Sequence, residues 1–210
     1  MSYTSLWTID KNWSGKEYTE YKNSHLFCPI IWDILLCKYI NKNERKKEYY
    51  PYDVVNHYLM WVGFCFDKEE ANKRWGILND RINKSELQYD RVLWELSGLS
   101  VFNAKDKYFV ADCIEKFWEE NSKYYDITDN EHIKERFLQI SKDIRELPKS
   151  AKYFVIHPTS CDDNVEWWFN CHRLSYWDKY VCEFTIIEND RIVGFCDNLQ
   201  MCGKSDSKAD

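Results

Sequence analysis

The spacing of the apolar residues changes twice along the chain. Near the N-terminus, Leu6–Ile9 and Lys16–Tyr21 are strand-like and flank turn residues at Asp10–Gly15, which predicts a β-hairpin. A helical spacing then begins, with one apolar stripe formed by Cys28, Ile31, Trp32, Leu35, Leu36 and Tyr39. After Pro148 the apolar residues return to short runs that are typical of strands.

Five more helices are predicted between residue 51 and Pro148. The first begins after Pro51 and would bury Val54, Val55, Tyr58, Leu59 and Val62. The next four would begin at the capping residues Asp67, Ser85, Asn103 and Asp129, and the helix after Ser85 would end at Gly98. The expected buried stripes are Ala71, Trp75, Leu78 and Ile82, then Phe109, Cys113, Ile114 and Phe117, then Ile133, Phe137, Ile140, Ile144 and Leu147.

The last sixty residues contain the remaining predicted strands. These are Tyr153–Ile156, Val165–Phe169, Tyr180–Ile187 and Arg191–Cys196, with a hairpin turn at Glu188–Asp190. The sequence therefore predicts an α+β fold, in which a central region of about six helices packs on an antiparallel sheet formed mainly by C-terminal strands, with an N-terminal β-hairpin. We expect residues 1–202 to form a single globular domain and residues 203–210 a disordered polar tail.

Composition limits the partners. Hydrophobic residues make up 44% of the 210 residues and aromatic residues 17%, which is enough for a core that needs no metal or disulfide. The formal net charge of −6 argues against binding to duplex nucleic acid, whose affinity comes from basic residues. We see no signal peptide and no run long enough to span a membrane, so we expect a cytoplasmic protein whose nine cysteines stay reduced.

Established catalytic motifs are not found in the sequence. It contains no phosphate-binding glycine loop, no G-x-S-x-G and no H-E-x-x-H. The pairs His157-x₃-Cys161 and Cys171–His172 lack the close cysteine spacing that zinc sites use, so we expect no metal and no cofactor. We interpret His57 and His132 as surface histidines.

The most distinctive segment is aromatic and lies in the C-terminal region. Trp167 and Trp168 are adjacent on a predicted strand, so they must point to opposite faces of the sheet. If helices cover one face, one of these side chains is left for a partner. The predicted partner-binding surface consists of Trp167, Trp168, Tyr176 and Trp177 with an acidic rim of Asp162, Asp163 and Glu166.

Two hypotheses of different classes follow. The first is a small protein-binding module, such as an inhibitor, immunity or host-takeover protein of phages and mobile elements, whose partner is a basic protein such as a nucleic-acid-binding enzyme. The alternative is an enzyme or nucleotide-handling protein with a site built from His157, Asp162, Asp163, Glu166 and His172. A polar pocket that unites these residues would favour the alternative, whereas a flat aromatic surface would favour binding.

Overall fold

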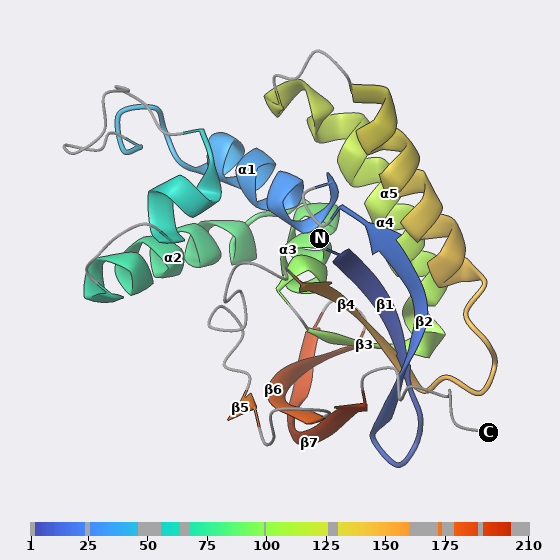
Figure 1. Cartoon of the computed structure of the whole chain (residues 1–210). Helices are drawn as coiled ribbons and strands as arrows, with labels where there is room; N and C mark the ends of the chain where they lie inside the picture. Colours follow the sequence, from blue (N-terminus) through green and yellow to red (C-terminus); the bar gives the residue numbers. More distant parts are fainter. Residues whose placement is uncertain are drawn as a thin grey trace.

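The structure, a computed structural model, has a mixed α+β fold, as the sequence predicts (Figure 1). It describes residues 3–23, 26–45, 56–63, 68–98, 100–125, 130–159, 172–173, 179–188 and 191–202. The strands are β1 (Tyr3–Ile9), β2 (Ser14–Lys22), β3 (Val101–Asn103), β4 (Tyr153–Thr159), β5 (His172–Arg173), β6 (Lys179–Glu188) and β7 (Arg191–Cys202). The helices are α1 (Cys28–Tyr39), α2 (Lys68–Asn83), α3 (Gln88–Ser97), α4 (Lys107–Asn121) and α5 (Asn130–Arg145), with short turns η2 (Leu59–Gly63), η3 (Ala104–Asp106) and η4 (Ser122–Tyr124).

The predicted N-terminal hairpin is confirmed, since β1 pairs antiparallel with β2. Its turn is held by Asp10, whose Oδ1 accepts the N–H groups of Asn12 at 2.7 Å and Ser14 at 3.0 Å. Trp13 lies in this turn with a φ of 61°, in the left-handed region that bulky residues rarely adopt. Its ring stacks on that of Tyr153 in β4, with centroids 4.7 Å apart.

The sheet returns to its starting strand. Strand β1 lies between β2 and β4, and β4 also pairs with β3. Strands β6 and β7 form a hairpin whose two outer edges reach the rest of the sheet through short parallel pairings, β7 with β2 and β6 with β3. The strands β1, β2, β7, β6, β3 and β4 therefore form a closed circuit of backbone pairings, with β5 added beside β6. The pairings of β7 with β2 and of β6 with β3 are both parallel and span two residues each.

Both faces of β1 and β4 are buried. Leu6, Phe154 and Ile156 belong to the main core, which the helices cover. The alternate residues Trp7 and Val155 point the other way and are buried outside that core, because the closed circuit turns this face inward. In these strands, the face opposite the helices is therefore not left open.

The predicted helical stripes mostly become core. Helix α1 has the bounds of its stripe, and Trp32 is buried with its Nε1 donating to Ser97 Oγ at 2.9 Å. In α5, Phe137 packs between the rings of Phe27 and Trp118, with centroids 4.8 and 5.0 Å away. Helices α4 and α5 lie side by side, whereas α2 stands at the outer end of α1 and α3, away from the sheet (Figure 1).

The remaining details of the helix predictions are confirmed, corrected or left outside the described residues. Ser85 does not cap α3, because the residue at the N-cap position is Leu87. The Ser85 hydroxyl instead accepts the backbone N–H of Leu87 at 3.1 Å. Gly98 ends α3 as predicted, and Asn103 caps η3, the short turn that leads into α4. Trp75, expected in a buried stripe, is exposed. The helix predicted after Pro51 is described only from residue 56, where a short π-helical turn at Leu59–Gly63 takes its place, and its first residues, 52–55, lie outside the described residues.

Candidate functional site

The predicted partner-binding surface falls in a part of the chain that the structure does not describe. This applies to Trp167, Trp168, Tyr176, Trp177, Asp162, Asp163 and Glu166. The surface therefore stays a prediction. Cys161 and Cys171, the thiols nearest to the two C-terminal histidines, lie outside the described residues as well.

One residue of the alternative enzymatic site can be placed with its side chain. His157 lies in β4 opposite Ser5 of β1, on the face that turns into the strand circuit. Burial lowers the pKa of His157 to about 4, so this imidazole is neutral at pH 7. His172 pairs through its backbone with Val181 in β6.

The described part of the chain gathers its chemistry elsewhere, around Asp33 in the middle of α1. This carboxylate is buried in a helix whose neighbouring residues are apolar. Its Oδ2 lies 3.0 Å from Nδ1 of His57, and its Oδ1 accepts the backbone N–H of Tyr58 at 2.6 Å. The His57 side chain is 67% exposed, so the carboxylate fixes one ring nitrogen while the rest of the ring faces solvent.

Asp33 and His57 change each other's protonation. Burial raises the pKa of Asp33, although the hydrogen bonds from His57 and Tyr58 act in the opposite direction. The hydrogen bond to Asp33 raises the pKa of His57 above its usual value of 6.5. Both shifts favour the bound proton, so the pair retains a proton to a higher pH than a free imidazole does.

A thiol and a guanidinium complete what we call the α1–His57 cluster: Asp33, Cys37, Arg45, Asn56 and His57. Arg45 Nη1 donates to Cys37 Sγ at 3.2 Å and to Asn56 Oδ1 at 2.6 Å. Burial raises the pKa of Cys37 despite the nearby Arg45. The thiol is therefore protonated at neutral pH and is a poor nucleophile.

The segment that carries His57 also joins α1 to α2. The ring of Tyr58 lies 5.6 Å from that of Trp32 in α1 and 6.0 Å from that of Trp94 in α3. Trp61 is buried, and Arg74 of α2 donates to its carbonyl oxygen at 3.0 Å. The segment that carries His57 therefore contacts α1, α3 and α2.

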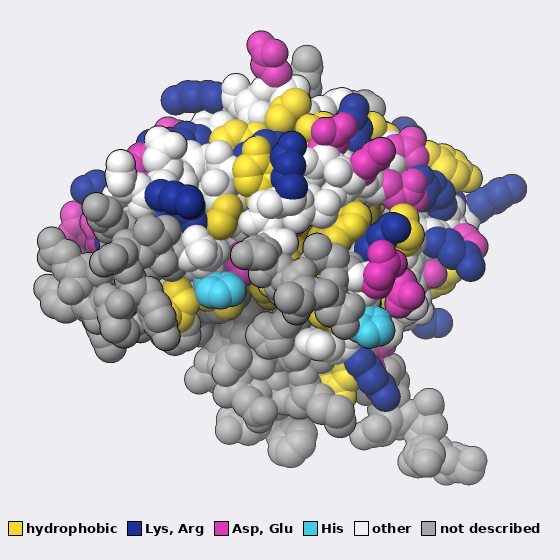
Figure 2. Space-filling view, turned by 90° about the horizontal axis from the view of Figure 1, so that it is seen from above, with side chains coloured by type: hydrophobic (Ala, Val, Ile, Leu, Met, Phe, Trp, Pro, Cys, Tyr) yellow, Lys and Arg dark blue, Asp and Glu magenta, His cyan; other side chains and the backbone are white. Residues whose placement is uncertain are grey.

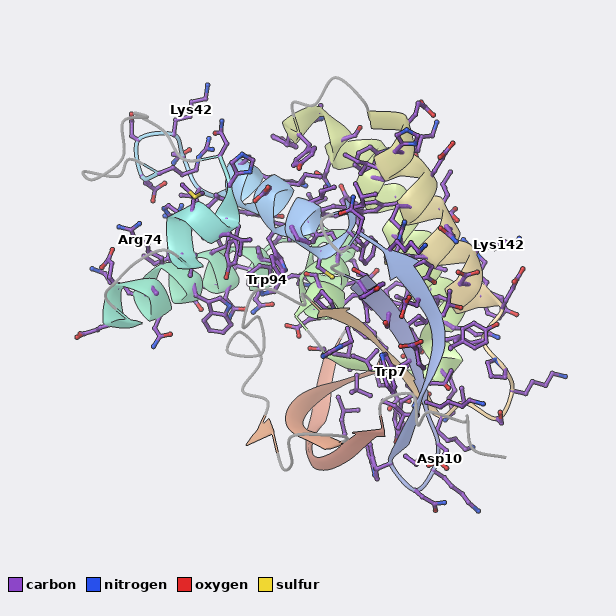
Figure 3. The ribbon with its side chains drawn as sticks, in the orientation of Figure 1. Trp7, Asp10, Lys42, Arg74, Trp94 and Lys142 are labelled. Atoms are coloured by element: carbon purple, nitrogen blue, oxygen red, sulfur yellow. The ribbon has the colours of Figure 1, made fainter. Side chains whose placement is uncertain are left out.

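Helix α2 leaves apolar side chains in solvent. Leu78 and Ile82 are buried, but Trp75 is 47% exposed and Ile77 is also exposed. On a helix of 3.6 residues per turn, Trp75 and Ile77 fall on opposite flanks of the buried stripe. Trp94 of α3, which Figure 3 shows beside α2, donates its Nε1–H to Asn79 Oδ1 at 2.8 Å and so joins α3 to α2.

The sequence contains a signal for Asp33 but not for its partner. A carboxylate inside an otherwise apolar stripe is unusual, and it indicates a buried polar contact. His57 is a surface residue, as predicted, but its contact with Asp33 spans 24 residues of sequence. No local pattern gives a contact of that separation.

Metal binding finds no support in the residues that the structure describes. Among them, no group of three or more His, Cys, Asp and Glu side chains could hold a metal ion. Nor is any helix in the described part of the chain long and apolar enough to cross a membrane. On the face seen in Figure 2, acidic and basic side chains are interspersed, so this face does not carry charge of a single sign.

Comparisons with protein families, curated proteins and solved structures found no match to the chain.

Proposed function

We propose that the protein is a protein-binding module that acts by occupying the surface of a partner, as an inhibitor, immunity or host-takeover protein does. The observation that carries this proposal is the exposure of Trp75. Trp7, Trp32, Trp61, Trp94 and Trp118 are each at most 7% exposed, whereas Trp75 is 47% exposed on a helix remote from the sheet. Tryptophan is one of the side chains enriched at the residues that dominate binding energy near the centres of protein interfaces.

The charge of the chain indicates what kind of partner would fit. A formal net charge of −6 attracts a basic protein, such as one that binds nucleic acids, and speeds the encounter at low salt. The aromatic and acidic residues of the C-terminal segment, from Asp162 to Trp177, would add a second contact in the same proposal. Reversing the charges of Asp162 and Asp163 should then slow association without changing thermal stability.

A pull-down with exposure-matched variants tests the role of Trp75. Wild type, Trp75→Ala and the control Leu138→Ala, whose leucine is 44% exposed on α5, are each incubated with host lysate. Proteins retained by wild type and control but lost from Trp75→Ala are identified, purified and titrated. We expect Trp75→Ala to weaken binding by about 2 kcal/mol or more. A purified partner that binds Trp75→Ala as tightly as wild type would contradict the proposal.

A second candidate function, that of an enzyme, is favoured by the Asp33–His57 pair. A carboxylate on Nδ1 orients an imidazole whose ring is exposed, which is how general acid–base catalysts are held. A screen of chromogenic ester and phosphate substrates against wild type, His57→Gln and Asp33→Asn addresses it. An activity that both substitutions remove, in folded protein, would support catalysis. Any activity that survives both substitutions would exclude this pair as its source.

A further inference from the structure

The end of the sheet near the β1–β2 turn combines an aromatic stack with basic side chains. The rings of Trp13 and Tyr153 lie 4.7 Å apart and within 10° of parallel, and both residues are partly exposed. Asp10, labelled in Figure 3, marks this turn at the tip of the hairpin. Strand β4 begins beside the hairpin, because Tyr153 pairs with Ile9 (Figure 1).

The turn holds Trp13 in a conformation that an unconstrained tryptophan avoids. Its φ of 61° is left-handed, and its N–H donates to the carbonyl oxygen of Asp10 at 3.2 Å. The carboxylate of Asp10 fixes the same turn through Asn12 and Ser14. A strained backbone that persists because its surroundings fix it is a common feature of binding sites. Here it holds the partly exposed Trp13 ring against that of Tyr153.

Exposed lysines occur in the segments that meet at this end of the sheet, namely Lys11, Lys16, Lys105, Lys149 and Lys152. Backbone hydrogen bonds join three of these segments. Lys152 N–H donates to the carbonyl oxygen of Ile9 at 2.8 Å, and Ala104 N–H donates to the carbonyl oxygen of Lys152 at 2.9 Å. No ion pair joins any of these lysines to another described residue, whereas Lys134 on α5 pairs with Glu131. The acidic residues Asp10, Asp106 and Glu188 of the same region also have partners within the protein.

We propose that this end of the sheet binds single-stranded nucleic acid, with a base stacked on the Trp13–Tyr153 pair and phosphates beside the lysines. Stacking on an aromatic ring accepts every base, and lysines beside it neutralise the backbone. A duplex keeps its bases stacked inside, so it cannot use the ring. This site is separate from Trp75 and goes beyond the proposed protein-binding function.

Fluorescence anisotropy with a labelled oligothymidine of about 15 nucleotides tests the proposal at low salt. Trp13→Gly removes the ring without strain, because glycine adopts a φ of 61° freely. We expect it to weaken binding about tenfold, and Trp13→Phe to restore most of the loss. The triple variant Lys11→Glu, Lys16→Glu and Lys152→Glu should show no measurable binding. The control Lys134→Glu with Lys142→Glu should stay within about twofold of wild type.

Two further readouts separate stacking from simple charge attraction. The affinity of wild type should fall with salt at a slope of about −0.7 per phosphate contact, and a base-free oligonucleotide of equal length should bind about tenfold more weakly. Equal binding of the base-free chain would overturn the stacking site and leave only a polyanion surface. Unchanged affinity of Trp13→Gly or of the triple variant, checked by thermal melting to be folded, would overturn the whole proposal. So would an absence of binding at the lowest salt.

Discussion

Helices α5 and α2 arise from the same kind of sequence pattern and end in different environments. Every residue of the predicted α5 stripe, from Ile133 to Leu147, is buried. In α2 only Leu78 and Ile82 are buried, while Trp75 and Ile77 face solvent. The difference shows that apolar spacing defines which residues can be buried together, but neighbouring elements decide whether they are. An uncovered flank that carries tryptophan is then the best candidate for recognition.

Polar contacts, in contrast, join both helices to their neighbours. Between α4 and α5, Ser141 donates to Glu115 at 2.6 Å, and Arg145 reaches Glu115 at 2.5 Å and Asp112 at 2.6 Å. In the last turn of α2, Arg81 contacts the carboxylate of Glu44 and the carbonyl oxygen of Tyr39. Both helices are thus joined to their neighbours by partly exposed ion pairs, so the contrast between them lies in the burial of their apolar side chains.

The largest expected effect lies in the α4–α5 region. Phe137 is fully buried among other aromatic rings, so Phe137→Ala should lower the free energy of unfolding by about 3–5 kcal/mol through lost burial and a cavity. Urea denaturation measures this value. A loss below about 1 kcal/mol would mean that α5 does not pack as described.

A smaller effect is expected where Asp33 of α1 contacts His57 and Tyr58. Asp33→Asn keeps an acceptor for Tyr58 N–H but weakens the contact with His57, so we expect a loss of about 1 kcal/mol at pH 6. Urea denaturation beside the variant His57→Gln checks the assignment. If Asp33→Asn costs nothing while His57→Gln does, the carboxylate is not what holds this segment.

The Asp33–His57 pair should also make stability depend on pH. Both pKa values are raised in the folded state, so the folded protein binds more protons than the unfolded chain. The contribution of His57 is therefore complete below pH 6.5 and is lost as pH rises through its folded pKa. Cys37 and Tyr125 also interact with Asp33, but their raised pKa values keep them protonated in this range. Melting temperatures of wild type should fall from pH 6 to pH 8 more than those of Asp33→Asn, and equal slopes would contradict the coupling.

The smallest effect on stability should come from Trp75. Because its ring is half in solvent and lies outside the core, Trp75→Ala should change the free energy of unfolding by about 0.5 kcal/mol or less. Urea denaturation in parallel with Phe137→Ala gives the comparison directly. A loss as large as that of Phe137→Ala would show that α2 is part of the core after all.

The sequence predicts the local elements well and the long-range closures poorly. The hairpin, α1 and α5 follow from spacing within short segments, and their buried residues agree with the pattern. The strand circuit depends on Gly15 meeting Met201 and on Phe102 meeting Ile187, and such separations leave no local signal. The prediction that Trp75 is buried is wrong for the same reason, because spacing alone does not reveal which elements cover a helix. The predicted C-terminal surface around Trp167 lies outside the described residues.

Photo-crosslinking next to Trp75 tests the central claim most directly, because it captures a partner whose identity is still open. A photoreactive amino acid replaces Asn72, one helical turn before Trp75, and in a control replaces Glu135, one turn before the exposed Leu138. Both positions are exposed, and Trp75 itself is retained. If α2 is the recognition surface, irradiation in host lysate will give a discrete protein adduct from position 72 and none from position 135. No adduct from position 72, or the same adducts from both positions, would contradict the account.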